Sequence, residues 1–349
     1  MKNNNLLVLN YVLDEDDKLL SHQIEIVEEI AKKIDHVTVL TGRIGKVPSI
    51  SKVTLISYEW IQSKNLTNAL KLLFTFFRVY RHEKISIIFS HMTLNQSLII
   101  LPFTKIFRIK HFVWYAHKSK NRFLGVSHKL FDGILTSTLD SCPIKSNKVY
   151  PIGQTINKLK FPAKRTINYP ISKLVHIGRF DPIKKIEVVI SSVSELRKNY
   201  PQLTLSVVGS ASGSENQVYE DRIKIDFLKY VKEGWLTFYP SVVRENIPLL
   251  LSDHDCFIHA CDAAIDKVIL EATISKLPVI TVNQEYLKEF GSWQSSTDES
   301  FLNLGEELKS AMNFSEDDLI KEVERRYSLA IEKHELSGWV ERLLKILSI

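Results

Sequence analysis

The fold is decided by residues 174–209, which read LVHIGRFDPIKKIEVVISSVSELRKNYPQLTLSVVG. Two short apolar runs, at 174–178 and 203–208, flank a longer amphipathic segment at 183–200. Short apolar runs are typical of buried strands, and longer amphipathic segments are typical of helices. The stretch therefore predicts a strand, a helix and a second strand, which is the unit from which parallel sheets are built.

The same alternation continues through most of the 349 residues. Further strands are expected at 6–12, 37–40, 53–56, 85–89, 111–115, 133–137, 236–238, 256–259 and 278–282, and further helices at 18–34, 66–80, 216–231, 245–252 and 267–275. This order predicts an α/β protein whose parallel sheets carry helices on both faces. The rhythm breaks near 152–170, where glycine and proline interrupt it. We therefore predict a first domain at 1–155, a linker at 156–170 and a second domain at 171–334, because a chain of this length normally forms two domains.

The composition is that of an ordinary globular protein, with 44% hydrophobic and 25% charged residues. Its cysteines, Cys142, Cys256 and Cys261, are too few and too scattered for a disulfide framework. We expect buried thiols in a reducing cytoplasm. The apolar run at 6–12 meets acidic residues at once, and no run approaches 18 apolar residues, so neither a signal peptide nor a membrane span is predicted.

Positive charge is concentrated between residues 64 and 129. This segment holds twelve Lys or Arg residues and one acid, Glu83, within a chain whose net charge is +6. The cations alternate with aromatic residues such as Phe74 and Phe77, a pattern that suits the surface of an anionic membrane. The alternative is that the aromatics are core and the cations only solvate the outer face. No nucleic-acid partner is predicted, because no binding motif accompanies the charge.

The first candidate site follows the strand at 174–178. Arg179 and Lys184 come at the strand's carboxyl end, where ligands of open α/β sheets bind. Both cations suit a diphosphate, and Pro182 suits a first helical turn whose free N–H groups add to an anion site. A solvated basic helix start is the alternative, and the spacing leaves both open.

The second candidate site follows the strand at 256–259. A loop leads to a helix whose first N–H groups, near residues 266–268, suit a phosphate. Glu271 lies one turn further along, among apolar residues, and a carboxylate in such surroundings needs a partner. Ribose hydroxyls are one possibility, and a nearby lysine is the other.

A third candidate is His117, which follows the strand at 111–115. Its place at a strand end favours a ligand-facing role, although a lone histidine is more often structural.

These segments together carry a resemblance. Residues 178–185, the strand end at Gly209 and residues 266–278 resemble the retaining glycosyltransferases of family 4. The likeness is best over 175–281 and looser over 114–117 and 152–154. It implies the GT-B fold, in which two Rossmann-like parallel-sheet domains face a central cleft. It also implies that the C-terminal helix, at about 335–349, packs back on the N-terminal, acceptor-side domain.

The resemblance further implies individual roles. Arg179 and Lys184 would bind the donor diphosphate, Glu271 the ribose, and the amides of Lys267 and Val268 the distal phosphate, while His117 would lie near the sugar. The implied catalytic residues are His117, Arg179 and Lys184, and the implied donor-binding residues are Gly178, Arg179, Lys184, Gly209, Tyr239, Asp266, Lys267, Val268 and Glu271. No metal and no cofactor is implied, since the nucleotide sugar is a substrate.

Two positions depart from the family pattern. The family commonly has a glutamate eight positions before the ribose-binding one, and this chain has Ala263 there. Its Asp-Lys-Val-Ile-Leu-Glu-Ala run resembles a recurrent variant, in which Asp262 or Asp266 would substitute. The N-terminal loop lacks the usual glycine pair, and Ser21 and His22 are the nearest polar residues for acceptor contacts.

The predicted function follows from this resemblance. We expect a metal-independent hexosyltransferase that moves a sugar, with retention, from a nucleotide sugar to a glycan or lipid-linked acceptor, in cell-surface polysaccharide synthesis. We expect it in the cytoplasm, in peripheral contact with the inner face of the membrane through residues 64–129. The alternatives are a non-catalytic nucleotide-binding module and a sugar-nucleotide epimerase of the same architecture.

Overall fold

The computed structural model describes residues 5–17, 20–164, 166–294 and 303–349. The chain divides into two compact units. The first contains residues 1–155 together with 336–349, and the second contains residues 156–335. Each is an α/β unit with its own parallel sheet, as the sequence predicts.

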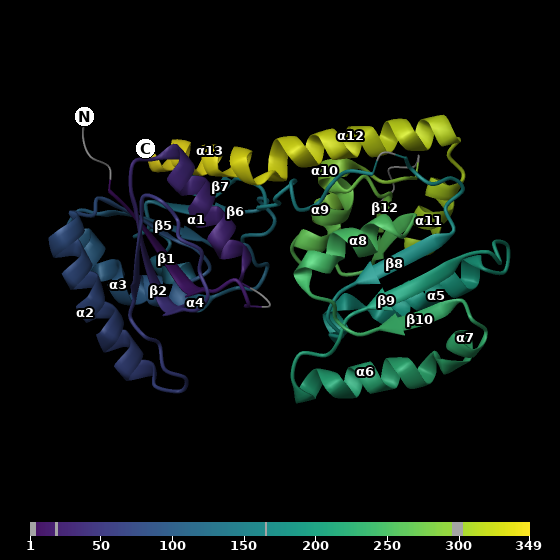
Figure 1. The fold of residues 1–349 in the computed structure, drawn as a ribbon, viewed down its shortest axis with the longest axis horizontal. Helices are drawn as coiled ribbons and strands as arrows, with labels where there is room; N and C mark the ends of the chain where they lie inside the picture. The colour runs from purple at the N-terminus through teal and green to yellow at the C-terminus, as the bar shows by residue number, and fades with distance from the viewer. Residues whose placement is uncertain (1–4, 18–19, 165, 295–302) are drawn as a thin grey trace. The chain divides into compact units, whose positions relative to one another are not determined.

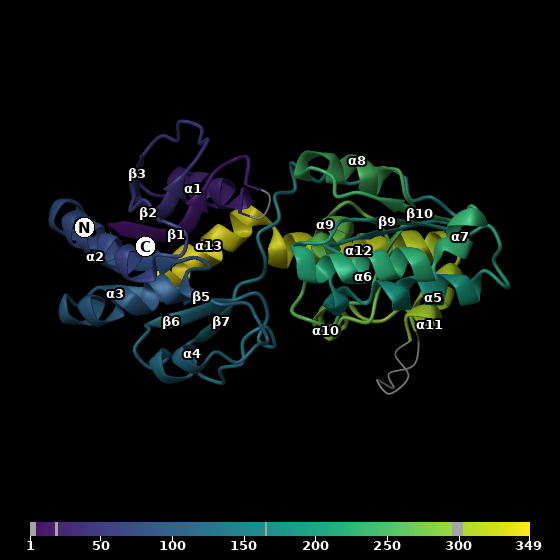
Figure 2. The same cartoon turned by 90° about the horizontal axis from the view of Figure 1, so that it is seen from below.

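The first unit is built on a seven-stranded sheet in the order β3-β2-β1-β4-β5-β6-β7, which runs from β3 at one edge to β7 at the other (Figure 2). Its strands are β1 Leu6–Leu13, β2 Val37–Ile44, β3 Val53–Ser57, β4 Ile87–Ser90, β5 Lys110–Trp114, β6 Gly133–Thr136 and β7 Val149–Pro151, and all adjacent strands pair in parallel. Its helices are α1 His22–Lys33, α2 Asn65–Glu83, α3 Leu94–Ile106, α4 Arg122–Ser127 and α13 Leu336–Leu347.

Helices cover both faces of this sheet. Successive side chains of β1 point to opposite faces and therefore enter two different cores. Leu6 and Val8 belong to the core that α1 and α13 cover, whereas Leu7 and Leu9 belong to the core that α2 and α3 cover. The helix predicted at 335–349 thus returns to the first unit, where Trp339 donates a hydrogen bond from Nε1 to the Gly153 carbonyl at 3.1 Å.

The second unit is built on a five-stranded parallel sheet in the order β10-β9-β8-β11-β12, with helices on both faces (Figure 1). Its strands are β8 Lys173–Ile177, β9 Thr204–Val208, β10 Leu236–Tyr239, β11 Cys256–His259 and β12 Val279–Thr281. Its helices are α5 Ile186–Leu196, α6 Ser214–Asp226, α7 Leu228–Lys232, α8 Ile247–Ser252, α9 Lys267–Ile274, α10 Gln284–Phe290, α11 Leu304–Met312 and α12 Glu316–His334, with the 3-10 helices η1 Pro182–Lys184 and η2 Arg244–Asn246.

Several boundaries differ from the sequence prediction. The helix expected at 183–200 is divided, because Lys185 takes a left-handed conformation, with φ 51°, between η1 and α5. The helix expected at 216–231 is likewise divided into α6 and α7. The first helix begins at His22 rather than at 18, and residues 18–19 lie outside the described residues. Strand β7 and helix α4 are short and were not predicted.

The sequence predicts a linker at 156–170, and within this range the described residues 156–164 and 166–170 belong to the second unit. Phe161 is 2% exposed and Ile167 is 9% exposed, and both belong to apolar clusters of that unit. The three cysteines are free and buried, as expected from their apolar neighbours. Among the described residues, no helix is both long and apolar enough to span a membrane.

Candidate functional site

The candidate donor site lies where β8, β9 and β11 end, three strands that include two adjacent pairs of the sheet. The loops after β8 and β9 meet closely at Gly178 and Gly209. A Cβ built on Gly209 would lie 1.8 Å from the Gly178 carbonyl oxygen. Only glycine at position 209 permits this close approach of the two backbones, because any side chain there would clash with the Gly178 carbonyl.

Arg179 and Lys184 extend from the loop after β8 but differ in their surroundings. The guanidinium of Arg179 is exposed and lies 3.4 Å from the Ser212 hydroxyl. The side chain of Lys184 is only 13% exposed. Asp181 fixes the turn between them by accepting a hydrogen bond from the Ile183 amide at 3.1 Å. The ammonium of Lys184 is therefore largely buried, whereas the guanidinium of Arg179 is exposed and accessible to a ligand.

Lys184 is held by Asp266, which precedes α9. The ammonium donates a hydrogen bond to Asp266 Oδ2, and His259 Nε2 lies 3.0 Å from the same oxygen. Burial alone would raise the pKa of Asp266, but the hydrogen bond from His259 and the charge of Lys184 outweigh it and hold the pKa well below its usual range. Burial lowers the pKa of His259, so we assign a neutral imidazole that donates to an ionised carboxylate.

Potential metal ligands gather at the same place. His259, Cys261 and Asp266 have ligand atoms within 4.8 Å of one another, and they are the one such group among the residues that the structure describes. The Lys184 ammonium already contacts this group, at 4.0 Å from Cys261 Sγ and by its hydrogen bond to Asp266. Burial also raises the pKa of the Cys261 thiol, which opposes the thiolate form that binds metals.

Glu271 is the most buried carboxylate of the predicted set. It lies on α9, its side chain is 1% exposed, and it forms an ion pair with Arg244 at the start of η2. The sequence left open whether Glu271 has a lysine partner. Its partner in the structure is an arginine, whose guanidinium also lies 5.7 Å from the centre of the Phe161 ring. The Nε atom of Arg244 is buried and has no hydrogen-bond partner among the described residues.

The remaining donor-side residues occupy two strand or helix ends. Lys267 and Val268 form the first turn of α9, directly after Asp266. Tyr239 ends β10 and is 47% exposed. The structure thus brings the predicted donor-side residues to the carboxyl ends of one sheet.

The predicted catalytic residue His117 and the predicted acceptor-side residues Ser21 and His22 lie in the first unit. His117 follows β5 and lines a pocket of about 330 Å³, and desolvation there lowers its pKa, so it is neutral. Ser21 lies directly before α1. His22 begins that helix, is buried, and places its ring edge-on to that of His91 with 6.3 Å between ring centres.

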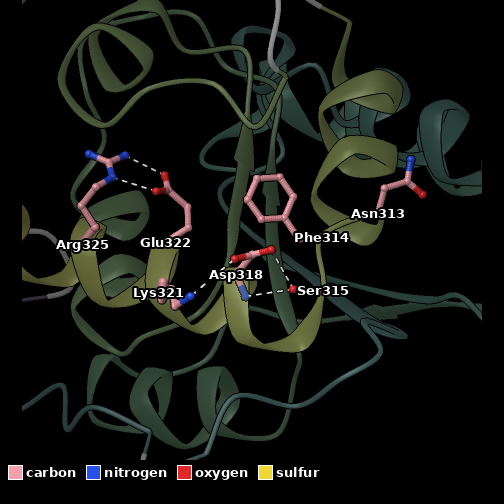
Figure 3. Close-up of a pocket in the computed structure, with 7 residues that line it drawn as sticks. All are labelled: Asn313, Phe314, Ser315, Asp318, Lys321, Glu322 and Arg325. Atoms are coloured by element: carbon pink, nitrogen blue, oxygen red, sulfur yellow. Dashed lines mark hydrogen bonds and ion pairs between the residues drawn. The ribbon is translucent and has the colours of Figure 1, made fainter.

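Another pocket in the second unit, of about 480 Å³, lies beside the start of α12 (Figure 3). Its charged side chains pair with one another, because Arg325 contacts Glu322 at 2.6 Å and Lys321 contacts Asp318 at 3.7 Å. Ser315 caps the helix through the Asp318 amide. These pairs satisfy the helix start, and none of the predicted site residues lines this pocket.

Sequence reasoning missed Arg244, His259 and His176. His259 ends β11, so the strand-end argument that identified His117 also applies to it. His176 lies inside β8, donates from Nδ1 to the Ile258 carbonyl at 3.0 Å and stacks on His259 with 6.0 Å between ring centres. Arg244 precedes a short helix, and no local pattern links it to Glu271.

Because His176 is buried and uncharged, we expect the free energy of unfolding of the second unit to fall in acid. Burial lowers its pKa from 6.5 to about 3, so below pH 6.5 the unfolded chain binds a proton that the folded chain does not. His176 alone should therefore lower the free energy of unfolding by about 1.4 kcal/mol per pH unit between pH 6.5 and about 3. Urea unfolding at several pH values should show this slope, and His176→Asn should reduce it. An equal slope in both proteins would contradict the assignment.

One family model matches a large part of the second unit. Residues 171–294, which contain the whole donor-side set, match the family model "Glycosyl transferases group 1". No curated protein sequence matches the chain.

Solved structures resemble the whole chain. HepE of Anabaena in complex with UDP is 13% identical, with a TM-score of 0.73 over 99% of both chains. Sucrose-phosphate synthase of Thermosynechococcus elongatus is 14% identical, with a TM-score of 0.74 over 99% of this chain and 98% of that one. TarM is 9% identical, with a TM-score of 0.75 over 100% and 99% of the two chains; a second TarM structure, of an S. aureus mutant in complex with UDP, also matches. The chain thus has the GT-B fold of glycosyltransferases and carries, over residues 171–294, a domain that matches the group 1 glycosyl transferases.

Proposed function

We propose that this protein is a retaining glycosyltransferase of family 4 that moves a hexose from a nucleotide sugar to a glycan or lipid-linked acceptor in cell-surface polysaccharide synthesis. One observation carries the proposal. Within the domain that matches the group 1 glycosyl transferases, two cations, a buried carboxylate and a helix start meet at the carboxyl ends of adjacent strands.

The chemistry of this arrangement suits departure of a nucleoside diphosphate. Negative charge develops on the diphosphate as the bond to the sugar breaks, and preorganised cations stabilise such charge. Lys184 is preorganised by Asp266, whereas Arg179 is exposed and suited to bidentate contact with phosphate oxygens. The amides of Lys267 and Val268 would add hydrogen bonds to the distal phosphate, Glu271 would bind the ribose, and His117 would lie near the sugar.

We propose that the donor is a UDP-sugar, so that its base is uracil. We also propose that transfer requires neither a metal nor a further cofactor. The structures of HepE and TarM with UDP support the base. Transfer without metal is supported by the position of Lys184, whose ammonium supplies positive charge at the only group of potential metal ligands in the described part of the chain.

A product analysis tests the function. The purified protein is incubated with a panel of UDP-hexoses and saccharide acceptors, with EDTA present, and the products are examined by NMR. The proposal expects a new glycosidic bond whose anomeric configuration matches that of the donor. An inverted product would overturn retention, and a changed sugar still attached to UDP would indicate an epimerase. Nucleotide binding with neither transfer nor slow donor hydrolysis would indicate a non-catalytic module.

We also propose that the protein works at the cytoplasmic face of an anionic membrane, through α2. Part of the aromatic segment is core, because Leu72, Phe76 and Val79 are buried. The other face of α2 exposes a stripe at four-residue spacing, formed by Leu66, Leu70 and Phe74. Arg78 and Arg81 continue the stripe one and two turns further along the helix and are exposed. Exposed apolar residues beside cations suit the interface of an anionic bilayer.

This contact predicts salt-sensitive sedimentation with liposomes. The protein should sediment with vesicles that contain anionic lipid at low salt and should be released as salt rises, because screening weakens attraction to the surface. Leu70→Ser/Phe74→Ser should reduce sedimentation, whereas Val218→Ser on the exposed side of α6 should not. Equal sedimentation of all three proteins would contradict a role for α2.

A further inference from the structure

The first unit contains a groove at the carboxyl ends of its strands. It has two lobes, of about 330 and 340 Å³, which share Tyr11, Asn95 and Gln96 as lining residues. The first lobe extends past β4 and β5 to His117, and the second passes beneath the loop after β3 to the start of α2. Each lobe falls within the usual size of small-molecule sites, about 300–1,000 Å³. We call the two lobes together the amide groove.

The amide groove carries no formal charge. About one residue in four of this chain is Asp, Glu, Lys or Arg, yet none of the described lining residues of either lobe is one of these four. The absence is notable because most of the lining residues come from the strongly basic segment 64–129. His117 does not add charge, since desolvation lowers its pKa. An anionic ligand would find no counter-ion in the groove lining.

Five amide side chains line the groove, namely Asn65, Asn68, Asn95, Gln96 and Asn121. Asn95 and Gln96 belong to the first turn of α3, where Asn95 is exposed and Gln96 is half-buried. An amide offers two donors and an acceptor with two lone pairs, which matches adjacent hydroxyls of a sugar. Tyr58 lies beside Gln96 and is buried, and burial raises the pKa of its phenol, so it adds no charge to the groove. Two of the lining amides are used internally: both ends of the Asn68 amide bond the Ile61 backbone, and Asn121 Oδ1 accepts from the Phe123 and Leu124 amides at the start of α4.

Aromatic rings form the walls of the same groove. Tyr11 and Trp60 lie edge to face, with 5.3 Å between ring centres, in the lobe after β3. Trp114 and Tyr115 line the other lobe but are almost fully buried, so Tyr11 and Trp60 offer the larger ring surfaces. Aromatic rings are large, rigid apolar surfaces, and they suit the C–H faces of a pyranose ring. Rings for these faces and amides for the hydroxyls are together the chemistry that recognises an uncharged sugar.

We infer that the amide groove is the acceptor site and that it binds an uncharged saccharide unit, rather than a uronic acid, a sugar phosphate or a peptide. The inference rests on the proposed function, which supplies the need for an acceptor. It adds the substrate class: the unit that receives the new bond carries hydroxyls but no charge. A lipid-linked acceptor meets this requirement if its terminal sugar is neutral.

The test is saccharide binding, measured by ligand-observed NMR on the full chain saturated with UDP. Probes are methyl glucoside, methyl galactoside and N,N′-diacetylchitobiose, compared with glucuronate and glucose 6-phosphate. We expect binding of at least one neutral probe and weaker binding of both charged probes. Asn95→Ala should weaken the neutral probe about fivefold, the effect of one hydrogen bond of about 1 kcal/mol. Trp60→Ala should weaken it as well, and Asn199→Ala, at an exposed asparagine of the second unit, should have no effect.

Each remaining outcome would overturn the inference. These outcomes are charged probes that bind as tightly as neutral ones, neutral probes that do not bind, and neutral probes that bind Asn95→Ala and Trp60→Ala as they bind the wild type. Competition between the neutral probe and a bound UDP-hexose would assign the groove to the donor sugar instead. UDP binding, measured in the same samples, keeps a failure of this inference distinct from a failure of the proposed function. Melting temperatures show that each variant is folded.

Discussion

Replacing Arg179 or Lys184 with alanine is expected to reduce glycosyl transfer by about a hundredfold or more. Each cation is proposed to stabilise charge that develops on the departing diphosphate, and a preorganised contact of this kind contributes about 2–4 kcal/mol to the transition state. Lys184 should show the larger effect on turnover, because Asp266 already fixes its ammonium in place. Steady-state kinetics of transfer check the prediction.

Lys185 provides a matched control for these variants. It adjoins Lys184, is exposed, and has a left-handed backbone with φ 51°. Lys185→Asn removes the same charge with a residue that tolerates this conformation, so transfer should remain near the wild-type rate. Wild-type turnover in Arg179→Ala or Lys184→Ala, or a loss in Lys185→Asn as large as theirs, would remove the assignment of the two cations.

Replacing Arg244 with alanine is expected to lower the free energy of unfolding by about 3–5 kcal/mol, because Glu271 would be left as an unpaired, buried carboxylate. For a unit of this size that loss corresponds to roughly 10 °C in melting temperature. The reverse change, Glu271→Gln, should cost less, because the side chain of Arg244 is 30% exposed and can reach water. Thermal unfolding of the two variants measures the difference.

The double variant Arg244→Ala/Glu271→Gln separates charge from packing. If the loss comes from an unpaired buried charge, neutralising Glu271 should recover most of the melting temperature. If the double variant is as unstable as the sum of the two single variants, the contribution of Arg244 is packing against Phe161 rather than charge compensation. The same proteins, titrated with UDP and 2′-deoxy-UDP, show whether Glu271 reads the ribose.

Local patterns predict most of the fold, and they place the proposed donor-side residues at strand ends. Apolar runs such as 256–259 form strands, and parallel strands bring their carboxyl ends to one edge, so the sequence alone is enough to group Arg179, Lys184 and Glu271. Boundaries failed where a single residue interrupts a helix. Lys185 is left-handed, and nothing in its side chain signals that conformation.

Long-range pairs could not be predicted in the same way. Arg244 is 27 residues from Glu271, and Lys184 is 82 residues from Asp266. Each pair depends on the order in which strands are arranged in the sheet, which a single sequence does not specify. The amide groove was even less predictable from the sequence. It is lined by Tyr11, Trp60 and Gln96, which come from separate segments that adjoin only after the seven-stranded sheet has formed.

A thermal-shift comparison tests the proposed donor site most directly. It measures UDP, GDP and ADP, with and without Mg²⁺, on the wild type and on Lys184→Ala. A ligand that binds only the folded state adds about 2.7 kcal/mol to the free energy of unfolding at a concentration of 100 Kd. This added stability raises the melting temperature. We expect a shift with UDP in the absence of metal, and a smaller shift or none in Lys184→Ala. No shift with any nucleotide at millimolar concentration, or an equal shift in the variant, would contradict a donor site built on Lys184.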